Sequence, residues 1–379
     1  MGGFRFMLAA FVAYSHFEGA FLPFNLGTSA VIGFYFISGY LMSLSYERFR
    51  DKAAHPVRAF YIDRIIRLYP AYLLVFAASV LFYWLSPKLA GLRPINLLEL
   101  LVIPNNYTKL FEHKMNLVIP PSWSLGAEFQ FYLLLPLLLR ASKQWRVALL
   151  YTFALLHLWT LTLPGALGDY SAACLKLSQR ACEAKASDLL GYRYLFFVGV
   201  VFILGNIAHE IYEKKSLPEG ILHSVIALYI LGFFLLFPVG TMIANENVFA
   251  VLLGVMLFIP LSLHYLQQLR LGIRPTGMPV PSPQPSPASG GGGERIAARC
   301  FTLSETDKWL GKLAYPLFLS HFLGQWIADM AWGGAAHNRF FHTQAMLVSV
   351  GLALLVALFQ EVIDRKRYAY RGFGRVTGK

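Results

Sequence analysis

Apolar residues recur along the chain in blocks of about 20, separated by shorter polar segments. An α-helix rises 1.5 Å per residue, so a block of about 20 residues can cross roughly 30 Å of hydrocarbon. The pattern predicts ten membrane-spanning helices, at about residues 4–24, 26–46, 69–86, 122–139, 147–163, 194–211, 221–238, 247–268, 309–330 and 344–363. We therefore expect an all-α integral membrane protein, with residues 1–379 forming one transmembrane domain.

Two stretches depart from this regular pattern. Residues 94–121 are apolar but interrupted by prolines, which predicts a re-entrant or surface-lying segment that lines a cavity. Residues 274–294 are rich in proline, serine and glycine and cannot bury a core, so we expect a flexible cytoplasmic linker within the domain. We expect no chemistry in the linker.

Composition and charge support a membrane protein. The chain is 56% hydrophobic and 14% charged, with a mean hydropathy of +0.52, whereas soluble domains have about 25% charged residues. With both termini in the cytoplasm, 24 of the 33 lysines and arginines fall on cytoplasmic segments, as the positive-inside rule expects. This topology explains the net charge of +13 without nucleic acid, for which we find no basic soluble domain.

The three cysteines bear on compartment and on metal binding. Cys174 and Cys182 fall on an outward loop, where they form either a disulfide or two unpaired thiols, while Cys300 lies on the reducing side. No cysteine or histidine spacing is typical of a metal centre, so we expect no metal.

Ionisable side chains inside the predicted spans mark a candidate site, because they are costly there unless they meet water or a partner. Arg5 begins the first span, and His16 lies eleven residues further, about 16 Å deeper and near the midplane. A histidine that only hydrogen-bonds a neighbouring helix is the simpler alternative. Similar depth estimates place four more polar residues in the same layer: Ser38, Glu128, Ser320 and His321. We expect these groups to surround a central polar cavity.

An imidazole beside a carboxylate suits general base catalysis. Glu128 would orient His16, which could then take a proton from a hydroxyl group. Candidates for an oxyanion or acceptor site are Ser38, Trp123, Ser320 and His321. The alternative is a proton relay in a transporter that exports a glycan precursor or a small acid, because intramembrane carboxylates and histidines also serve that role.

Two arginines on the cytoplasmic side suggest a phosphate-binding site. Arg64 and Arg67 are three residues apart and share a helical face, so their guanidinium groups could bind phosphates together. Ordinary positive-inside charge in contact with lipid headgroups is the alternative reading for the other basic residues near them.

Together these residues resemble the bacterial membrane-bound acyltransferase-3 family, whose members include carbohydrate O-acetylases. The resemblance runs nearly end to end and rests on a conjunction of motifs in family order: Arg5 with His16, FYFISGY (34–40), RIIRLYP (64–70), WSLGAEFQFYLLLP (123–136), YPLFLSH (315–321) and EVIDRKR (361–367).

The resemblance implies an O-acyltransferase of the bacterial inner membrane. Such an enzyme moves an acyl group, most often acetyl, from cytoplasmic acetyl-CoA or another acyl-CoA to a hydroxyl of a cell-envelope or exported carbohydrate. It implies that His16 is the essential histidine with Arg5 as its partner, and that Glu128 is the motif's acidic residue. It also implies that Arg64 and Arg67 meet acyl-CoA, and we expect Arg5 to contribute to the same cofactor site.

Overall fold

The computed structural model describes residues 1–17, 25–86, 97–111, 117–160, 193, 195–236, 246–270, 303–333 and 340–371. The predicted linker at 274–294 and the outward cysteines Cys174 and Cys182 lie outside these residues, so the expectations for them stay predictions.

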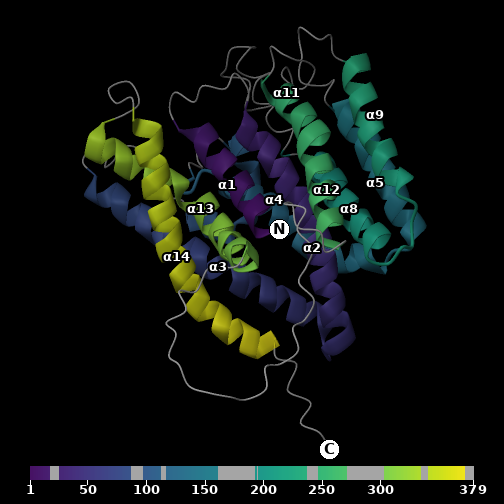
Figure 1. Cartoon of the computed structure of the whole chain (residues 1–379), viewed down its shortest axis with the longest axis horizontal. Helices are drawn as coiled ribbons and strands as arrows, with labels where there is room; N and C mark the ends of the chain where they lie inside the picture. Colours follow the sequence, from purple (N-terminus) through teal and green to yellow (C-terminus); the bar gives the residue numbers. More distant parts are fainter. Residues whose placement is uncertain are drawn as a thin grey trace, which may run out of the picture.

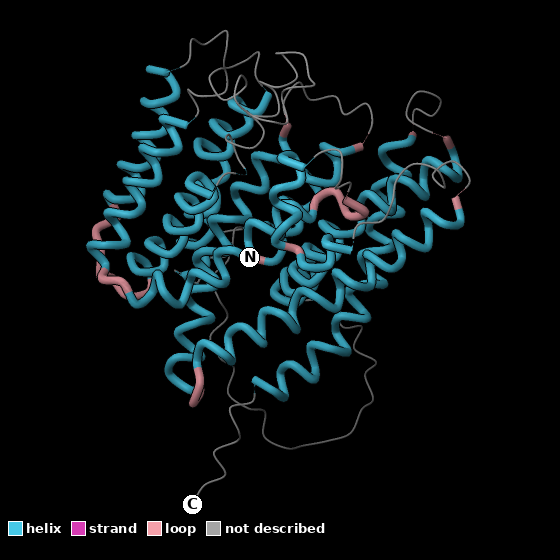
Figure 2. The backbone as a smooth tube through the Cα atoms, turned by 180° about the vertical axis from the view of Figure 1, so that it is seen from behind, coloured by secondary structure: helices cyan, strands magenta, loops and turns pink. Residues whose placement is uncertain are grey.

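The described ranges are helical and contain no strand (Figures 1 and 2). The α-helices are α1 (Gly2–His16), α2 (Leu26–Lys52), α3 (Pro56–Leu85), α4 (Ser122–Arg140), α5 (Lys143–Thr160), α8 (Leu195–Tyr212), α9 (Gly220–Leu236), α11 (Glu246–Leu253), α12 (Ile259–Arg270), α13 (Leu303–Trp332) and α14 (Phe341–Arg371). Two 3₁₀ turns, η1 (Leu97–Leu101) and η2 (Ile103–Phe111), precede α4, and a π-helical turn, η4 (Gly254–Phe258), joins α11 to α12. Each expected span overlaps a described helix.

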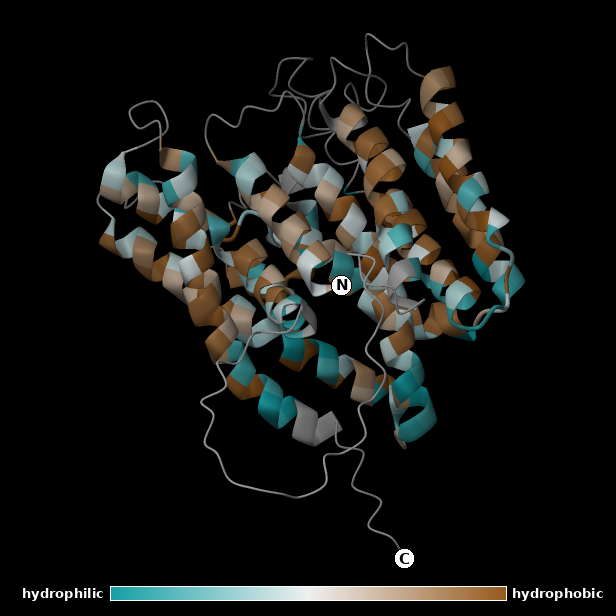
Figure 3. Cartoon of the chain, in the orientation of Figure 1, coloured by the Kyte–Doolittle hydropathy of each residue, from teal (hydrophilic) through white to brown (hydrophobic). Residues whose placement is uncertain are grey.

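The helices have the surface of a membrane protein. Five helical stretches are long and apolar enough to cross a bilayer, namely α2, α3, α8, Phe249–Gln267 and most of α14. Large apolar side chains are exposed on α3, α9 and α14, for example Leu81, Leu235 and Leu355, along helices that Figure 3 shows as largely hydrophobic. Exposed apolar surface of this extent fits contact with lipid. The count of ten crossings and the cytoplasmic termini stay predictions.

The first helix differs from the expected span at 4–24. It begins at Gly2 and ends at His16, and Phe17 after it is extended, with φ −72° and ψ 135°. His16 therefore lies at the end of α1 and not in the middle of a longer helix, while its rise of about 16 Å from Arg5 is as expected.

Close contacts fix the register of α1 against two neighbours. At Gly2, an added Cβ would overlap the carbonyl of Asp307 on α13, and His16 stacks on His321 of the same helix, so α1 and α13 run in the same direction. On the other side, Gly33 of α2 packs against Leu8, and α2 runs opposite to α1. This three-helix contact positions the candidate site.

Two glycines bring α2 and α8 into backbone contact. An added Cβ would lie 2.2 Å from the carbonyl oxygen of Phe202 at Gly39, and 2.1 Å from that of Phe36 at Gly205. Only glycine lets the helices approach so closely at these two positions.

The segment before α4 folds as the short turns η1 and η2 packed on that helix. Glu99 is fully buried and accepts hydrogen bonds from the backbone N–H groups of Val118 (2.7 Å) and Ile119 (2.8 Å). At Gly126 an added Cβ would come within 2.6 Å of the carbonyl oxygen of Val102. These contacts fix where α4, and the polar residues it carries, begins.

Candidate active site

A small cavity of about 80 Å³, with polar groups in a largely apolar lining, lies between α1, α2, α3, α4 and α13. By the same measure a water needs about 10–15 Å³, so the cavity has room for a handful of waters. Its polar and charged lining residues are Arg5, Tyr35, Ser38, Arg64, Arg67, Ser124, Glu128, Tyr132 and Tyr315. The structure thus brings together one predicted carboxylate, one predicted serine and all three predicted arginines.

Glu128 is held by two hydroxyl groups. The Oγ of Ser38 on α2 donates to Glu128 Oε1 at 2.8 Å, and the OH of Tyr132, one turn further along α4, donates to the same oxygen at 2.6 Å. Arg5 lies close enough to interact electrostatically with this carboxylate. The Ser38 hydroxyl therefore donates its hydrogen bond to Glu128 and is not free to stabilise an oxyanion.

The three arginines of the cavity differ in how they are held. Arg64 is buried, donates to Asp63 at 2.9 Å and to Ser45 at 2.6 Å, and is fixed by these partners. Among the described residues, no side-chain hydrogen bond or ion pair involves the guanidinium of Arg5 or Arg67, although both line the cavity. We call Arg5, Arg64 and Arg67 the arginine layer; its charge exceeds that of the cavity carboxylate, which favours an anionic ligand.

His16 and His321 form a second polar centre. Their rings stack with centroids 5.4 Å apart and an interplanar angle of 17°, and Phe322 lies 4.9 Å from each. His321 is fully buried, and its Nδ1 lies 2.9 Å from the carbonyl oxygen of Phe318. Nδ1–H donates to that oxygen, so the lone pair of the ring is on Nε2, which has no hydrogen-bond partner among the described residues. We call His16 and His321 the histidine pair.

The two centres lie at different levels, so the prediction of a single polar layer is wrong. Arg5 and His16 are eleven residues apart on α1, which corresponds to about 16 Å. Leu8 of α1 packs on Gly33 of α2, and the two helices run in opposite directions. Arg5, which precedes Leu8, and Ser38, which follows Gly33, therefore lie near the same level. No hydrogen bond joins Glu128 to His16 in the described ranges, and neither histidine lines the cavity.

The error has a simple physical cause. Sequence-based depths start from assumed entry points at the membrane surface, whereas the heights of α2 and α4 relative to α1 are set by contacts between helices, such as that of Gly33 with Leu8 and that of Ser38 with Glu128. The expected contact between Glu128 and His16 is therefore replaced by two contacts, one with Ser38 and Tyr132 and one between the two imidazoles.

An aromatic group separates the centres. Phe318 lines the cavity, its ring lies 6.3 Å from that of His321, and it packs edge-on against Phe34 at 6.1 Å. Tyr35, also in the lining, donates its hydroxyl to the carbonyl oxygen of Ser124 at 3.4 Å. The cavity thus ends about one helical turn from the histidine pair.

Two other predicted residues have defined contacts. The Ser320 hydroxyl donates to the carbonyl oxygen of Pro316 at 2.9 Å, so it is satisfied by its own helix. Trp123 is buried with the guanidinium carbon of Arg193 4.3 Å above its ring. Arg193 is also the charged group that acts electrostatically on His16, a role for which the sequence carried no motif.

Comparisons with known proteins concern the chain as a whole. A family model described as "Acyltransferase domain" matches residues 2–359. A protein of Aquifex aeolicus (strain VF5), described as uncharacterized, is 28% identical over 255 residues, which cover 66% of this chain and 90% of that protein. No solved structure matches the chain.

Proposed function

The chain belongs to the acyltransferase-3 family, and we propose that it transfers an acyl group, acetyl in the first instance, from cytoplasmic acyl-CoA to a carbohydrate hydroxyl. Membership supports the acyl transfer, and the apolar helices support a multi-pass membrane location. The donor, the acceptor of the cell envelope or exported glycans, and the bacterial inner membrane are proposals that follow from the family resemblance.

The observation that carries the proposal is the distance between the two polar centres. The arginine layer would bind the diphosphate of CoA, with Arg5 and Arg67 as the groups whose guanidinium donors are still available. The arm from diphosphate to sulfur has about a dozen bonds and, when extended, covers roughly 15 Å. This length matches the rise of about 16 Å between Arg5 and His16, so the thioester would reach the histidine pair.

The histidine pair supplies the base in this scheme. An imidazole nitrogen takes the proton of the acceptor hydroxyl, the oxygen attacks the thioester carbonyl, and the C–S bond breaks. The CoA thiolate leaves and is protonated, which returns the imidazole to its neutral form. His16 keeps the role of base that the sequence suggested, and its structural partner is His321 in place of Glu128. Glu128 would instead balance the positive charge of Arg5 and hold in place the end of the site that binds acyl-CoA.

The size of the cavity sets a further requirement. A volume of about 80 Å³ holds a few waters, so side chains must move apart before the CoA arm can enter. Phe318, which contacts His321 and packs on Phe34, lies between the cavity and the histidine pair, so these two rings would have to move. A site closed by aromatic rings until the donor arrives would protect the thioester from water.

Membrane vesicles from cells that express the chain test the proposal, because they contain the natural acceptor. We expect radiolabelled acetyl groups to pass from acetyl-CoA to vesicle material. Arg67→Ala should weaken CoA binding, whereas His16→Ala should abolish transfer and leave CoA binding intact. Arg58→Ala is the matched control, since this exposed arginine of α3 does not line the cavity. Unchanged transfer in both test variants would refute the assignment.

A further inference from the structure

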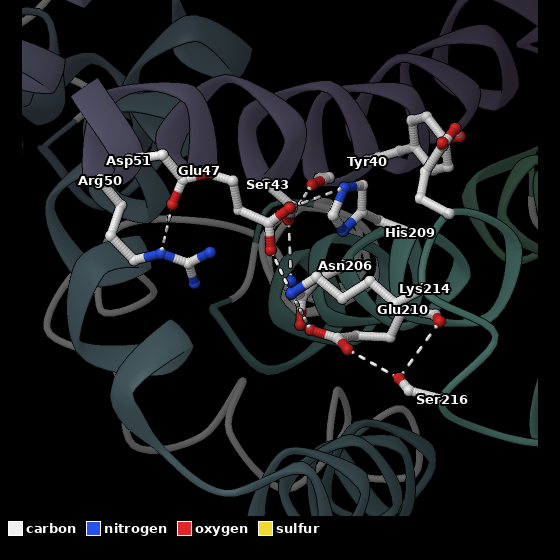
Figure 4. Close-up of polar contacts among 12 residues, drawn as sticks. Tyr40, Ser43, Glu47, Arg50, Asp51, Asn206, His209, Glu210, Lys214 and Ser216 are labelled. Atoms are coloured by element: carbon white, nitrogen blue, oxygen red, sulfur yellow. Dashed lines mark hydrogen bonds and ion pairs between the residues drawn. The ribbon is translucent and has the colours of Figure 1, made fainter.

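A second buried polar cluster, away from the acyltransferase site, joins the ends of α2 and α8 (Figure 4), and Arg146 adds the start of α5 to it. It combines carboxylates, cations and one histidine, and its members are Ser43, Glu47, Arg146, Asn206, His209, Glu210, Lys214 and Ser216. Neither the motifs of the sequence nor the proposed reaction uses these residues.

Three of these side chains have the chemistry and the spacing of metal ligands. Ligand atoms of Glu47, His209 and Glu210 all lie within 4.8 Å of one another. Ligands about 2.0–2.2 Å from a common ion are separated by up to about 4.4 Å, so only small side-chain rotations are needed. One imidazole with two carboxylates is a donor set that Zn²⁺ and Mn²⁺ accept.

His209 gives independent evidence for a ligand. It is fully buried, and neither of its ring nitrogens makes a hydrogen bond with any residue in the described part of the chain. Its Nε2 points toward the cluster, 3.4 Å from Glu47 Oε2 (Figure 4), a contact that is an ion pair only when the imidazole is protonated. A neutral imidazole that is buried without a hydrogen bond carries a desolvation cost, which a metal bond at Nε2 would offset.

A cation already occupies the position between the carboxylates. The ammonium group of Lys214 forms ion pairs with Glu47 and with Glu210, at 3.1 Å in the second pair. The Lys214 side chain is 33% exposed, whereas that of Glu210 is 2% exposed, so the lysine can withdraw into water while the carboxylates stay. The ammonium thus stands where a divalent ion would bind.

The surroundings hold Glu210 in place whether or not Lys214 is present. Arg146 donates to Glu210 Oε1 at 3.0 Å, and Ser216 donates to Oε2 at 2.8 Å. Arg146 also donates to Asn206 at 2.8 Å, which fixes its own orientation. Partners of this kind, which orient a ligand without touching the ion, are a regular feature of metal sites.

We propose that Glu47, His209 and Glu210 bind one divalent transition-metal ion, of the Zn²⁺ or Mn²⁺ class, which displaces the ammonium of Lys214. Glu47 lies on α2, while His209 and Glu210 lie on α8, so the ion would link these two helices. Its role is structural and independent of the acyl transfer. The expectation of no metal rested on the spacing of residues that are close together in the sequence. Such spacing cannot detect ligands such as Glu47 and His209, which lie 162 positions apart on different helices.

Calorimetric titration of the purified full chain with ZnCl₂ and with MnCl₂, together with metal analysis after dialysis, tests the proposal. We expect one ion per chain with at least one of the two metals. Glu47→Gln should weaken binding by at least about tenfold, and Lys214→Met should strengthen it because the competing cation is removed. Metal should also raise the unfolding temperature of the wild type but not that of His209→Gln.

Glu361→Gln is the matched control, because this carboxylate also pairs with a lysine, Lys312, at 2.8 Å but has no histidine partner among the described residues. It should leave metal binding unchanged. Absence of binding in the wild type overturns the proposal, even if Lys214→Met binds, because Lys214 is then the permanent partner of the carboxylates. An equal loss in Glu47→Gln and Glu361→Gln also overturns it, since binding would then be adventitious.

Discussion

The buried carboxyl group of Glu99 should make the stability of the protein depend on pH. Burial raises its pKa to about 7, although the backbone N–H groups of Val118 and Ile119 lower it in part. Glu99 lies on η1, outside the membrane-spanning helices, and ties that turn to the residues just before α4. Glu99→Gln keeps one acceptor oxygen for these donors and removes the titratable group.

The sign and size of the effect follow from linkage. Between pH 4.5, the ordinary pKa, and pH 7, the folded state binds more protons at Glu99 than the unfolded state does, so stability falls as pH rises. At about 1.4 kcal/mol for each pKa unit, the whole contribution is roughly 3 kcal/mol. It is fully present below pH 4.5 and is lost above pH 7.

Thermal unfolding of the detergent-purified chain from pH 4.5 to 8 measures this contribution. The wild type should lose about 3 kcal/mol relative to Glu99→Gln across the range, a relative fall in Tm of a few degrees. Asp51→Asn is the control, because Asp51 is 61% exposed and its variant should follow the wild type. Parallel profiles for the wild type and Glu99→Gln would refute the assignment of a raised pKa to this buried carboxyl.

Two further predictions concern packing and buried charge. Gly39→Ala or Gly205→Ala should each destabilise the protein by about 2 kcal/mol, because the added methyl group would push α2 and α8 apart. Gly351→Ala is the control and should not destabilise the protein, since an added Cβ there meets nothing within 4 Å. Thermal unfolding measures both effects. Arg146→Met should lower the free energy of unfolding by about 3 kcal/mol in the same assay, because it removes an ion-pair partner of the buried carboxylate of Glu210. Lys312→Met breaks the exposed pair with Glu361 and should lower it by under about 1 kcal/mol. Equal losses in test and control variants would contradict either prediction.

Hydrophobic periodicity located the helices well, because each span must be apolar along its length and this property is local. Helix ends were harder to locate. The third span was expected at 69–86, but α3 begins at Pro56, a residue that suits the first turn of a helix. The spacing of Arg64 and Arg67 did predict a helical turn before residue 69, but hydropathy measures only the apolar part of a helix and therefore gave no starting residue for it.

Contacts between helices could not be read from the sequence, and they decide the site. That Glu128 meets Ser38 depends on the relative heights of α2 and α4. Contacts within one helix were easier to predict from the sequence. The hydroxyl of Ser320 donates a hydrogen bond to the carbonyl oxygen four residues earlier, as serine commonly does in helices. That habit alone argues against a serine as a free oxyanion donor.

The spacing of Arg5 and His16 gains a physical meaning from the two-level site. Eleven residues are close to three full turns of 3.6, so both side chains lie on one face of α1 while differing in height by about 16 Å. One residue more or fewer would rotate the imidazole by about 100° away from His321 and change the height by only 1.5 Å. The motif therefore constrains direction more sharply than distance. A helix that had only to reach the right depth would tolerate such a change, whereas one that must present phosphate-binding and proton-accepting groups along a single extended donor would not.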